Sequence, residues 1–330
     1  MLSRVADSIF WMTRYIERAE NVARFIDVNM QLAMDVGSDT TTPADQWAPL
    51  VITTGDYELF TELYGQPDQR KALEFLTFDE RNPNAIITCL NAARENARTV
   101  REMISSSMWE ELNKFYLMVR AAKGKVDLAD AGYEFFKQVK LASHLLEGIT
   151  VATMSHGEAW HFARMGRLLE RADKTSRILD VKYYVLLPSA ADVGTPLDTV
   201  QWSALLESAS ALEMYRKRFG RITPVNVADF LILDSEFPRA IHFCLIKTED
   251  SLLSITGGQH GRFRSQAEKR LGRLRAELDY TQIGEIIDQG LHEFIDEFQI
   301  QLNQVGEAIH ETFFALRPVA GGVTVGQQQA

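Results

Sequence analysis

Apolar residues recur with a helical period along almost the whole chain. Near the start they fall one helical turn apart, at Met12, Ile16, Ala19, Ala23 and Ile26, which places them on one face of an α-helix. Similar stripes run through 84–115, 129–154, 158–187 and 266–316. Sustained alternation of apolar and polar residues, the pattern of a half-buried strand, is missing. The sequence therefore predicts an all-α protein.

Turn-forming residues interrupt this pattern at two internal places. They are concentrated in "GSDTTTPAD" at 37–45 and "PSAADVGTPLD" at 188–198, and such clusters predict loops. The tail at 318–330 is rich in Gly and carries no apolar stripe, so we predict that it is disordered. The remaining residues, 1–317, are predicted to form a single helical domain.

The two loops follow segments that resemble each other. Residues 14–28 and 167–181 are identical at seven of fifteen positions, and with a two-residue insertion "AIITCL" at 85–90 matches "AIHFCL" at 240–245. Cys89 thereby corresponds to Cys244. We predict a helical bundle built from two duplicated halves, 6–118 and 159–271, related by a pseudo-two-fold axis. C-terminal helices that extend to 317 would close it.

The repeated segment carries a charged arc as well as an apolar face. Stepping about 100° per residue places five polar residues within about 120°: Arg14, Glu17, Arg18, Asn21 and Arg24. The simplest interpretation is a solvated face held by ion pairs three and four residues apart.

Two details favour a covered arc instead. Phe10, Phe25 and Val28 lie inside or beside it, and the second copy keeps Arg-x-x-Glu-Arg. Positions expected at the surface differ, with Lys174 in place of Asn21. We therefore predict a network at the pseudo-two-fold axis that contains Glu17, Arg18, Glu170 and Arg171, with Arg14 and Arg167 beside them. Because burying charges is costly unless each is paired, such a network suggests a specific role.

A further basic row lies at 91–113, where Arg98 and Arg101 flank an apolar stripe. The duplicate segment has Glu249 and Asp250 instead, so a site built here would be asymmetric. Guanidinium groups match carboxylate and phosphate geometry. If the helices converge, the candidates for an anion pocket are Arg14, Arg98, Arg101 and Arg167, together with the two arginines of the network.

Composition narrows the possible partners and the possible location. The chain is 46% hydrophobic and 24% charged, as in ordinary folded proteins, and its net charge is −10. That charge disfavours nucleic acid and anionic membranes as partners. No apolar run is long enough for a signal peptide or a membrane span, and two cysteines do not make a disulfide framework. A cytoplasmic protein is expected.

Signals for catalysis are weak. Glu158-x-x-His161 and Glu307-x-x-His310 have the spacing found in ferritin-like di-iron bundles. The pairs occupy non-equivalent positions of the two halves, so we expect no bound metal. The sequence also lacks a glycine-rich phosphate-binding loop, so it gives no sign of a nucleotide cofactor. Cys89 and Cys244 lie in apolar runs, where a thiol is usually packed in the core.

Three blocks together resemble the alpha-E family, an all-helical bacterial family named for its Glu-Arg pairs. They are "MLSRVADSIFWMTRYIERAENVARFIDV", "REMISSSMWEELN" and "GEAWHFARMGRLLERADKTSRILDVKYYVLLP". The resemblance places the family motif at Glu17-Arg18 and Glu170-Arg171. It also implies a circularly permuted ATP-grasp ligase as partner, often with a transglutaminase-like protein, and hence a peptide-ligation or protein-modification system.

The resemblance assigns no reaction to this domain, and two classes of function stay open. In the first, the chain binds an anionic substrate of the ligase or completes its active site. In the second, it is a non-catalytic interaction scaffold whose Glu-Arg pairs only fix how the two halves dock. Whether the chain is itself an enzyme is not decided by its residues.

Overall fold

The computed structural model describes residues 1–35, 43–185 and 196–315, and within these ranges it contains helices and no strand. The all-α prediction is confirmed. Most of the two segments predicted as loops, and the whole of the tail at 318–330, lie outside the described residues. Helices begin inside both predicted loop segments, at Pro43 and at Pro196, because proline suits the first turn of a helix.

The helices follow one another in two similar series. The first series is α1 (Ser3–Asp35), α2 (Pro43–Thr54), α3 (Tyr57–Tyr64), α4 (Gln69–Thr77), α5 (Ile86–Thr99), α6 (Ser106–Ala122) and α7 (Leu128–Thr153). The second is α8 (Glu158–Val185), α9 (Pro196–Ser208), α10 (Leu212–Phe219), α11 (Pro224–Leu233), α12 (Ile241–Thr256), α13 (Gln266–Tyr280), α14 (Ile283–Gln289) and α15 (Leu291–Ile309), with a π-helical turn at His310–Phe314.

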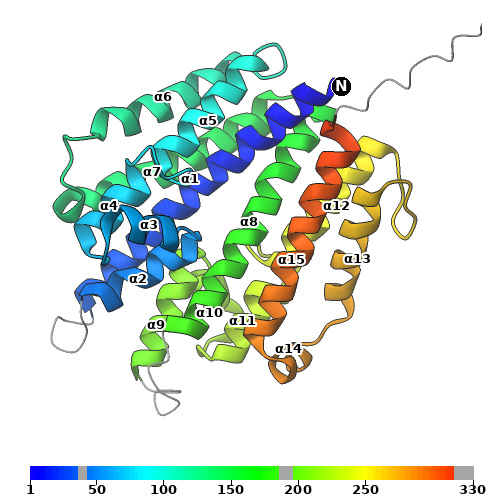
Figure 1. Ribbon diagram of the computed structural model, residues 1–330. Helices are drawn as coiled ribbons and strands as arrows, with labels where there is room; N and C mark the ends of the chain where they lie inside the picture. The colour runs from blue at the N-terminus through cyan, green and yellow to red at the C-terminus, as the bar shows by residue number, and fades with distance from the viewer. Residues whose placement is uncertain (36–42, 186–195, 316–330) are drawn as a thin grey trace, which may run out of the picture.

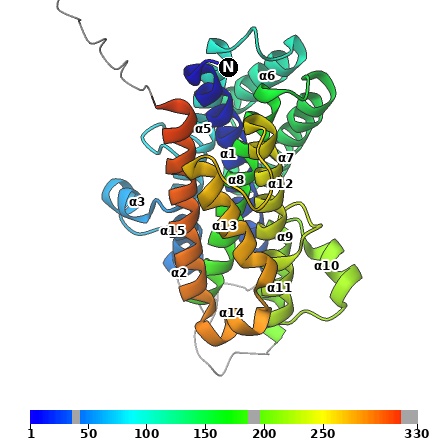
Figure 2. The ribbon, with the colours of Figure 1, turned by 90° about the vertical axis from the view of Figure 1, so that its right-hand side faces the viewer.

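Two long helices, α1 and α8, pack against each other in the middle of the molecule (Figure 1). Helices α5 and α7 pack on α1, and α12 and α15 pack on α8. The shorter helices cross over between the halves, since α2 contacts α8 and α9 contacts α1. Figure 2 shows α13 and α15 side by side on the second half. One cluster of buried apolar side chains extends through both series.

Corresponding residues of the two halves have similar surroundings. Trp47 and Trp202 are both buried. The Sγ atom of Cys89 lies 3.7 Å from the carbonyl oxygen of Pro83, and that of Cys244 lies 3.6 Å from the carbonyl oxygen of Pro238. These matched contacts support the predicted duplication, while the superposition of 6–118 on 159–271 stays a prediction. Among the described helices, none combines the length and the low charge needed to cross a bilayer.

Candidate functional site

The charged arcs of α1 and α8 face each other because the two helices approach very closely. Thr13 Oγ1 donates a hydrogen bond to the carbonyl oxygen of Ala163 at 2.7 Å. A Cβ atom on Gly166 would lie only 2.2 Å from the carbonyl oxygen of Phe10. Thr13 and Gly166 occupy corresponding positions of the two repeats. Small residues at this crossing bring the Glu-Arg motifs that follow it within bonding distance.

The two Glu-Arg motifs pair with each other reciprocally. Arg171 donates to Glu17 through Nε at 2.9 Å and Nη2 at 2.8 Å. Arg18 donates to Glu170 through Nε at 2.7 Å and Nη2 at 3.1 Å. Both are two-pronged contacts, which are the strongest form of this ion pair. The structure thus brings together all four residues of the sequence-predicted network.

Glu17 and Glu170 are fully withdrawn from water, with 1% and 0% of their surface exposed. Burial by itself would raise the pKa of Glu170, but the charges of Arg18, Arg14 and Lys174 hold that pKa well below its usual value. Glu17 behaves in the same way, since burial is outweighed by Arg171 and Arg239 and its pKa is lowered. Both carboxylates are therefore ionised at neutral pH and are paired from several sides.

The network is larger than the sequence indicated. Arg239, at the start of α12, donates to Glu17 at 3.1 Å and also binds Glu20. Residues expected at the surface are buried, with Asn21 2% and Lys174 6% exposed, so that expectation was wrong. Asn21 donates to Glu17 at 3.0 Å, and the Lys174 ammonium lies 3.6 Å from Glu170. Each arc is covered by the opposite repeat.

Arg239 was missed because no local pattern marks it. The alignment of the two repeats contained one signal that could have identified it. Arg239 follows Pro238, and the matching residue after Pro83 is Asn84, whose Oδ1 accepts a hydrogen bond from Arg18 at 3.0 Å. Both loop residues therefore contact the Glu-Arg motifs, one as a cation and the other as a neutral amide.

Arg14 and Arg167 correspond in the repeats but have different partners. Arg14 donates to Glu170 through Nε at 2.9 Å, and its guanidinium carbon lies 4.8 Å from the centre of the Trp11 ring. Arg167 instead pairs with Glu147 of α7, at 3.2 Å. The flanking arginines are thus beside the network as predicted, yet only Arg14 contacts a motif carboxylate among the described residues.

Arg98 and Arg101 lie outside the network. Arg98 is exposed and pairs with Glu95 of its own helix at 2.8 Å. Arg101 is also exposed, and its guanidinium carbon lies 4.6 Å from the centre of the Trp109 ring. Neither contacts a charged residue of the network within the described part of the chain. The anion pocket expected from convergence of all these arginines is therefore not formed, because Arg98 of α5 and Arg101 in the turn after it face solvent.

A groove of about 400 Å³ opens beside Arg14, between α1, α8 and α15. This volume falls in the usual range of small-molecule sites. Its polar lining residues are Arg14, Asp173, Asn303, Glu307 and His310, and its apolar ones include Phe10, Trp11, Leu169, Leu302 and Phe314. The π-helical turn begins at His310, and such turns are frequent at functional sites.

The space beside Arg167 is almost filled. It measures about 20 Å³ and is lined by Arg167, Glu147 and Trp160 among others, which leaves room for about one water molecule. The two halves therefore differ most at the arginines that flank the motif. Sequence reasoning missed this difference because α15 lies outside the recognised repeats.

Both cysteines are buried beside the network and are poor nucleophiles. Burial raises the pKa of Cys89 and of Cys244 to about 12. A thiol with such a pKa is almost entirely protonated at neutral pH and does not act as a nucleophile. The prediction that these residues pack in the core is confirmed by their full burial.

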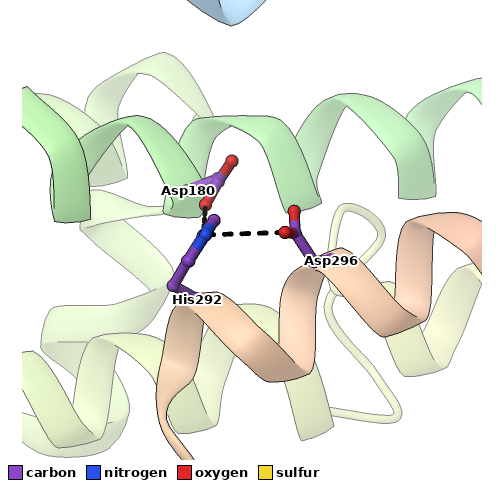
Figure 3. Close-up of side chains that lie close together, drawn as sticks. All are labelled: Asp180, His292 and Asp296. Atoms are coloured by element: carbon purple, nitrogen blue, oxygen red, sulfur yellow. Dashed lines mark hydrogen bonds and ion pairs between the residues drawn. The ribbon is translucent and has the colours of Figure 1, made fainter.

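One group of potential metal ligands exists in the described part of the chain, at Asp180, His292 and Asp296 (Figure 3). His292 of α15 lies between the two carboxylates, with Nδ1 2.7 Å from Asp180 and Nε2 3.5 Å from Asp296. Hydrogen bonding to Asp180 raises the pKa of His292. Each ring nitrogen faces a different carboxylate, which is the arrangement of a protonated imidazole and not of a metal ligand.

The repeat gives the same interpretation. Asp27, which corresponds to Asp180, pairs with the Lys140 ammonium of α7. A cation from the covering helix therefore meets the aspartate in both halves. The two Glu-x-x-His pairs belong to no group of potential ligands within the described residues. Glu158 instead accepts a hydrogen bond from the N-terminal ammonium at 2.9 Å.

A family model described as a predicted alpha-helical domain with a conserved ER motif matches residues 1–314. The chain belongs to the Alpha-E family. The two Glu-Arg sequences of this chain, Glu17-Arg18 and Glu170-Arg171, fit that description. They form a buried contact between the two long helices, in which Arg171 pairs with Glu17 and Arg18 with Glu170.

Curated relatives of the Alpha-E domain are uncharacterized proteins of Mycobacterium bovis and of the Mycobacterium tuberculosis strains CDC 1551 and H37Rv. Each is 24% identical over 343 residues, which cover 98% of this chain. The chain spans only 37% of the length of these relatives. No solved structure matches it.

Proposed function

We propose that this Alpha-E domain is a component of an ATP-grasp-associated peptide-ligation or protein-modification system. In this proposal the domain binds an anionic substrate group, or completes the ligase site, at the groove beside Arg14. The partner is a circularly permuted ATP-grasp ligase, and a transglutaminase-like protein acts in the same system. These partners follow from the family resemblance.

The observation that carries the proposal is the position of Arg14. It lines the groove with 19% of its side chain exposed, whereas Glu170, which holds it, is fully buried. Its guanidinium is oriented by Glu170 on one edge and by the Trp11 ring on its face. A cation fixed in this way is preorganised for an anionic group. The Glu-Arg network is thus assigned a positioning role and does not itself touch substrate.

The length of the relatives also supports a partner. Because the match covers 37% of each relative, nearly two thirds of those chains lie outside it and have room for further domains. In these relatives the matched region is expected to work together with the rest of the chain.

The proposal is tested by producing the chain together with a circularly permuted ATP-grasp ligase from the same genome. We expect the two to co-purify and the ligase product to depend on the chain. Arg14→Gln should keep the association and reduce product formation about ten- to a hundredfold, the effect of losing one charged hydrogen bond. Arg98→Gln, an exposed arginine paired only within its own helix, is the matched control. A chain that neither associates with the ligase nor changes its product contradicts the proposal.

The alternative is a non-catalytic scaffold in which the Glu-Arg pairs are structural. It is favoured by the complete burial of Glu17 and Glu170, whose oxygens are already occupied by arginines. Under this alternative, Glu170→Gln lowers stability, and Arg14→Gln leaves the ligase product unchanged.

A further inference from the structure

The wall of the groove formed by α15 and the turn after it carries three polar side chains, and His310 among them packs against the Phe314 ring. Asn303, Glu307 and His310 are exposed and lie four and three residues apart, on one face of the helix. Asn303 and Glu307 make no side-chain hydrogen bond or ion pair with any described residue. The Glu307 carboxylate, in a groove lined by both polar and apolar side chains, is available to a ligand.

The opposite wall offers an arginine with spare donors. Arg14 uses Nε and Nη2 for Glu170, while its Nη1 bonds to no residue in the described part of the chain. A guanidinium carries five N–H donors, so several remain for a second acceptor. Trp11 and Phe314 supply aromatic surface in the same groove.

The other half of the molecule indicates what the second acceptor is. At the corresponding arginine, Arg167, the covering helix supplies the carboxylate of Glu147 at 3.2 Å, and the space closes to about 20 Å³. Glu307 of α15 lines the groove, but no carboxylate of the described part of α15 pairs with Arg14. A carboxylate is thus built in on one side of the pseudo-two-fold axis, and room for one is left on the other.

We propose that the groove binds a small amino-carboxylate with an apolar side chain, of the class of α-amino acids and short peptides. Its carboxylate occupies beside Arg14 the place that Glu147 holds beside Arg167. Its ammonium group pairs with Glu307, and its apolar side chain packs on Trp11 and Phe314. This inference deepens the proposed function and rests on it, since it names the substrate class of the same groove.

The charges of the groove disfavour a phosphate ligand. Asp173 lines the floor but is already neutralised by Lys174 at 3.1 Å and Arg177 at 3.0 Å. Glu307 is not neutralised, and it would repel a dianion near Arg14. A zwitterion satisfies both groups, because its positive end meets the free carboxylate and its negative end meets the arginine.

Calorimetric titration of the full chain with three matched probes tests this inference. The probes are L-phenylalanine, 3-phenylpropanoate, which lacks the amine, and phenethylamine, which lacks the carboxylate. We expect phenylalanine to bind and each truncated probe to bind about ten- to a hundredfold more weakly. Glycyl-phenylalanine distinguishes a free amino acid from a peptide, and tighter binding of either one supports the class. The inference is overturned if neither phenylalanine nor the dipeptide binds.

Glu307→Gln is the decisive variant, because Glu307 is exposed and its side chain bonds to no described residue. The variant should weaken the binding of phenylalanine about tenfold or more and leave the binding of 3-phenylpropanoate unchanged. Glu297→Gln, which alters an exposed acid elsewhere on α15, should change the affinity for neither probe. Equal phenylalanine affinity in Glu307→Gln and the unaltered chain overturns the inference.

If the chain supports the ligase but binds no amino-carboxylate, the groove assignment fails and the proposed function stands. If it binds the amino-carboxylate but never associates with the ligase, the groove assignment stands and the proposed function fails.

Discussion

At the scale of single residues, Glu170 is a carboxylate held by three cations at the crossing of α1 and α8. It contacts Arg14, Arg18 and Lys174 and has no exposed surface. Glu170→Ala leaves three cations without their shared partner. Stranding a buried charge costs about 3–5 kcal/mol, so we expect the free energy of unfolding in urea to fall by about that amount.

The control for this experiment is Glu74→Ala, which removes an exposed carboxylate of α4. Substitutions at such surface positions usually change the free energy of unfolding by about 0.5 kcal/mol or less. If Glu170→Ala has no greater effect than Glu74→Ala, the network contributes nothing to stability, and the positioning role assigned to it should be abandoned.

The sequence predicted which residues of the motif matter but not all of their partners. Glu17, Arg18, Glu170 and Arg171 were identified because repetition and apolar neighbours both marked them. Arg239 was not, since its contact with Glu17 joins residues 222 positions apart and depends on where α12 begins. Glu147 was missed for a similar reason, because α7 lies outside the repeated segments.

At the scale of helices, the close approach of α1 and α8 depends on Gly166. Alanine normally stabilises a helix by about 0.5–1 kcal/mol relative to glycine. Here the added Cβ would lie 2.2 Å from the carbonyl oxygen of Phe10 and 2.7 Å from Thr13 Oγ1. We expect Gly166→Ala to destabilise the protein by about 1–3 kcal/mol, as overpacking does, when thermal unfolding is followed by circular dichroism.

Gly148→Ala in α7 is the matched substitution, because nothing lies within 4 Å of its added Cβ. It should leave the unfolding temperature unchanged or raise it. Similar behaviour of the two variants would mean that α1 and α8 separate without cost, contrary to the packing of the Glu-Arg pairs.

The attachment of α15 to α8 should depend on pH through His292. Its pKa is raised by the hydrogen bond to Asp180, so the folded protein holds the proton more tightly than the unfolded chain. The stabilisation is therefore complete below the unfolded pKa of about 6.5 and is lost as pH rises through the higher folded value.

The measurement is urea unfolding at a series of pH values between 5 and 9. The unaltered chain should lose stability above about pH 6.5, and His292→Gln should remove that part of the profile. The Asp27–Lys140 contact, which contains no histidine, is the internal comparison from the other half. An identical profile in His292→Gln would contradict the imidazolium interpretation.

Helix content was predictable from periodicity alone, and the structure confirms it along the described chain. The arrangement of the helices was only partly predictable. Arg98 of α5 and Arg101 in the turn after it face solvent, whereas Arg14 of α1 faces a groove. This difference depends on which neighbours cover each segment. Charged residues look alike in sequence whether they are covered or exposed, so an apolar period cannot make this distinction.

At the scale of the whole molecule, the Glu-Arg motif of each half has its ion-pair partners in the other half. Residues 1–153, produced alone, carry Glu17 and Arg18 without Arg171 and Glu170. They also expose the apolar surface of α1 that α8 covers. We expect this fragment to show no cooperative thermal unfolding, and we expect addition of residues 154–330 to restore it. A fragment that is a folded monomer by itself would contradict the mutual dependence of the halves.

The reciprocal pairs also set an order of events during synthesis. Arg18 and Glu170 are separated by 152 positions, and a ribosome adds about 5–20 residues per second. The motif of α1 therefore leaves the ribosome about 8–30 s before its partner exists. Docking of the two motifs cannot begin until α8 has emerged, so translation sets the earliest time at which the reciprocal pairs form.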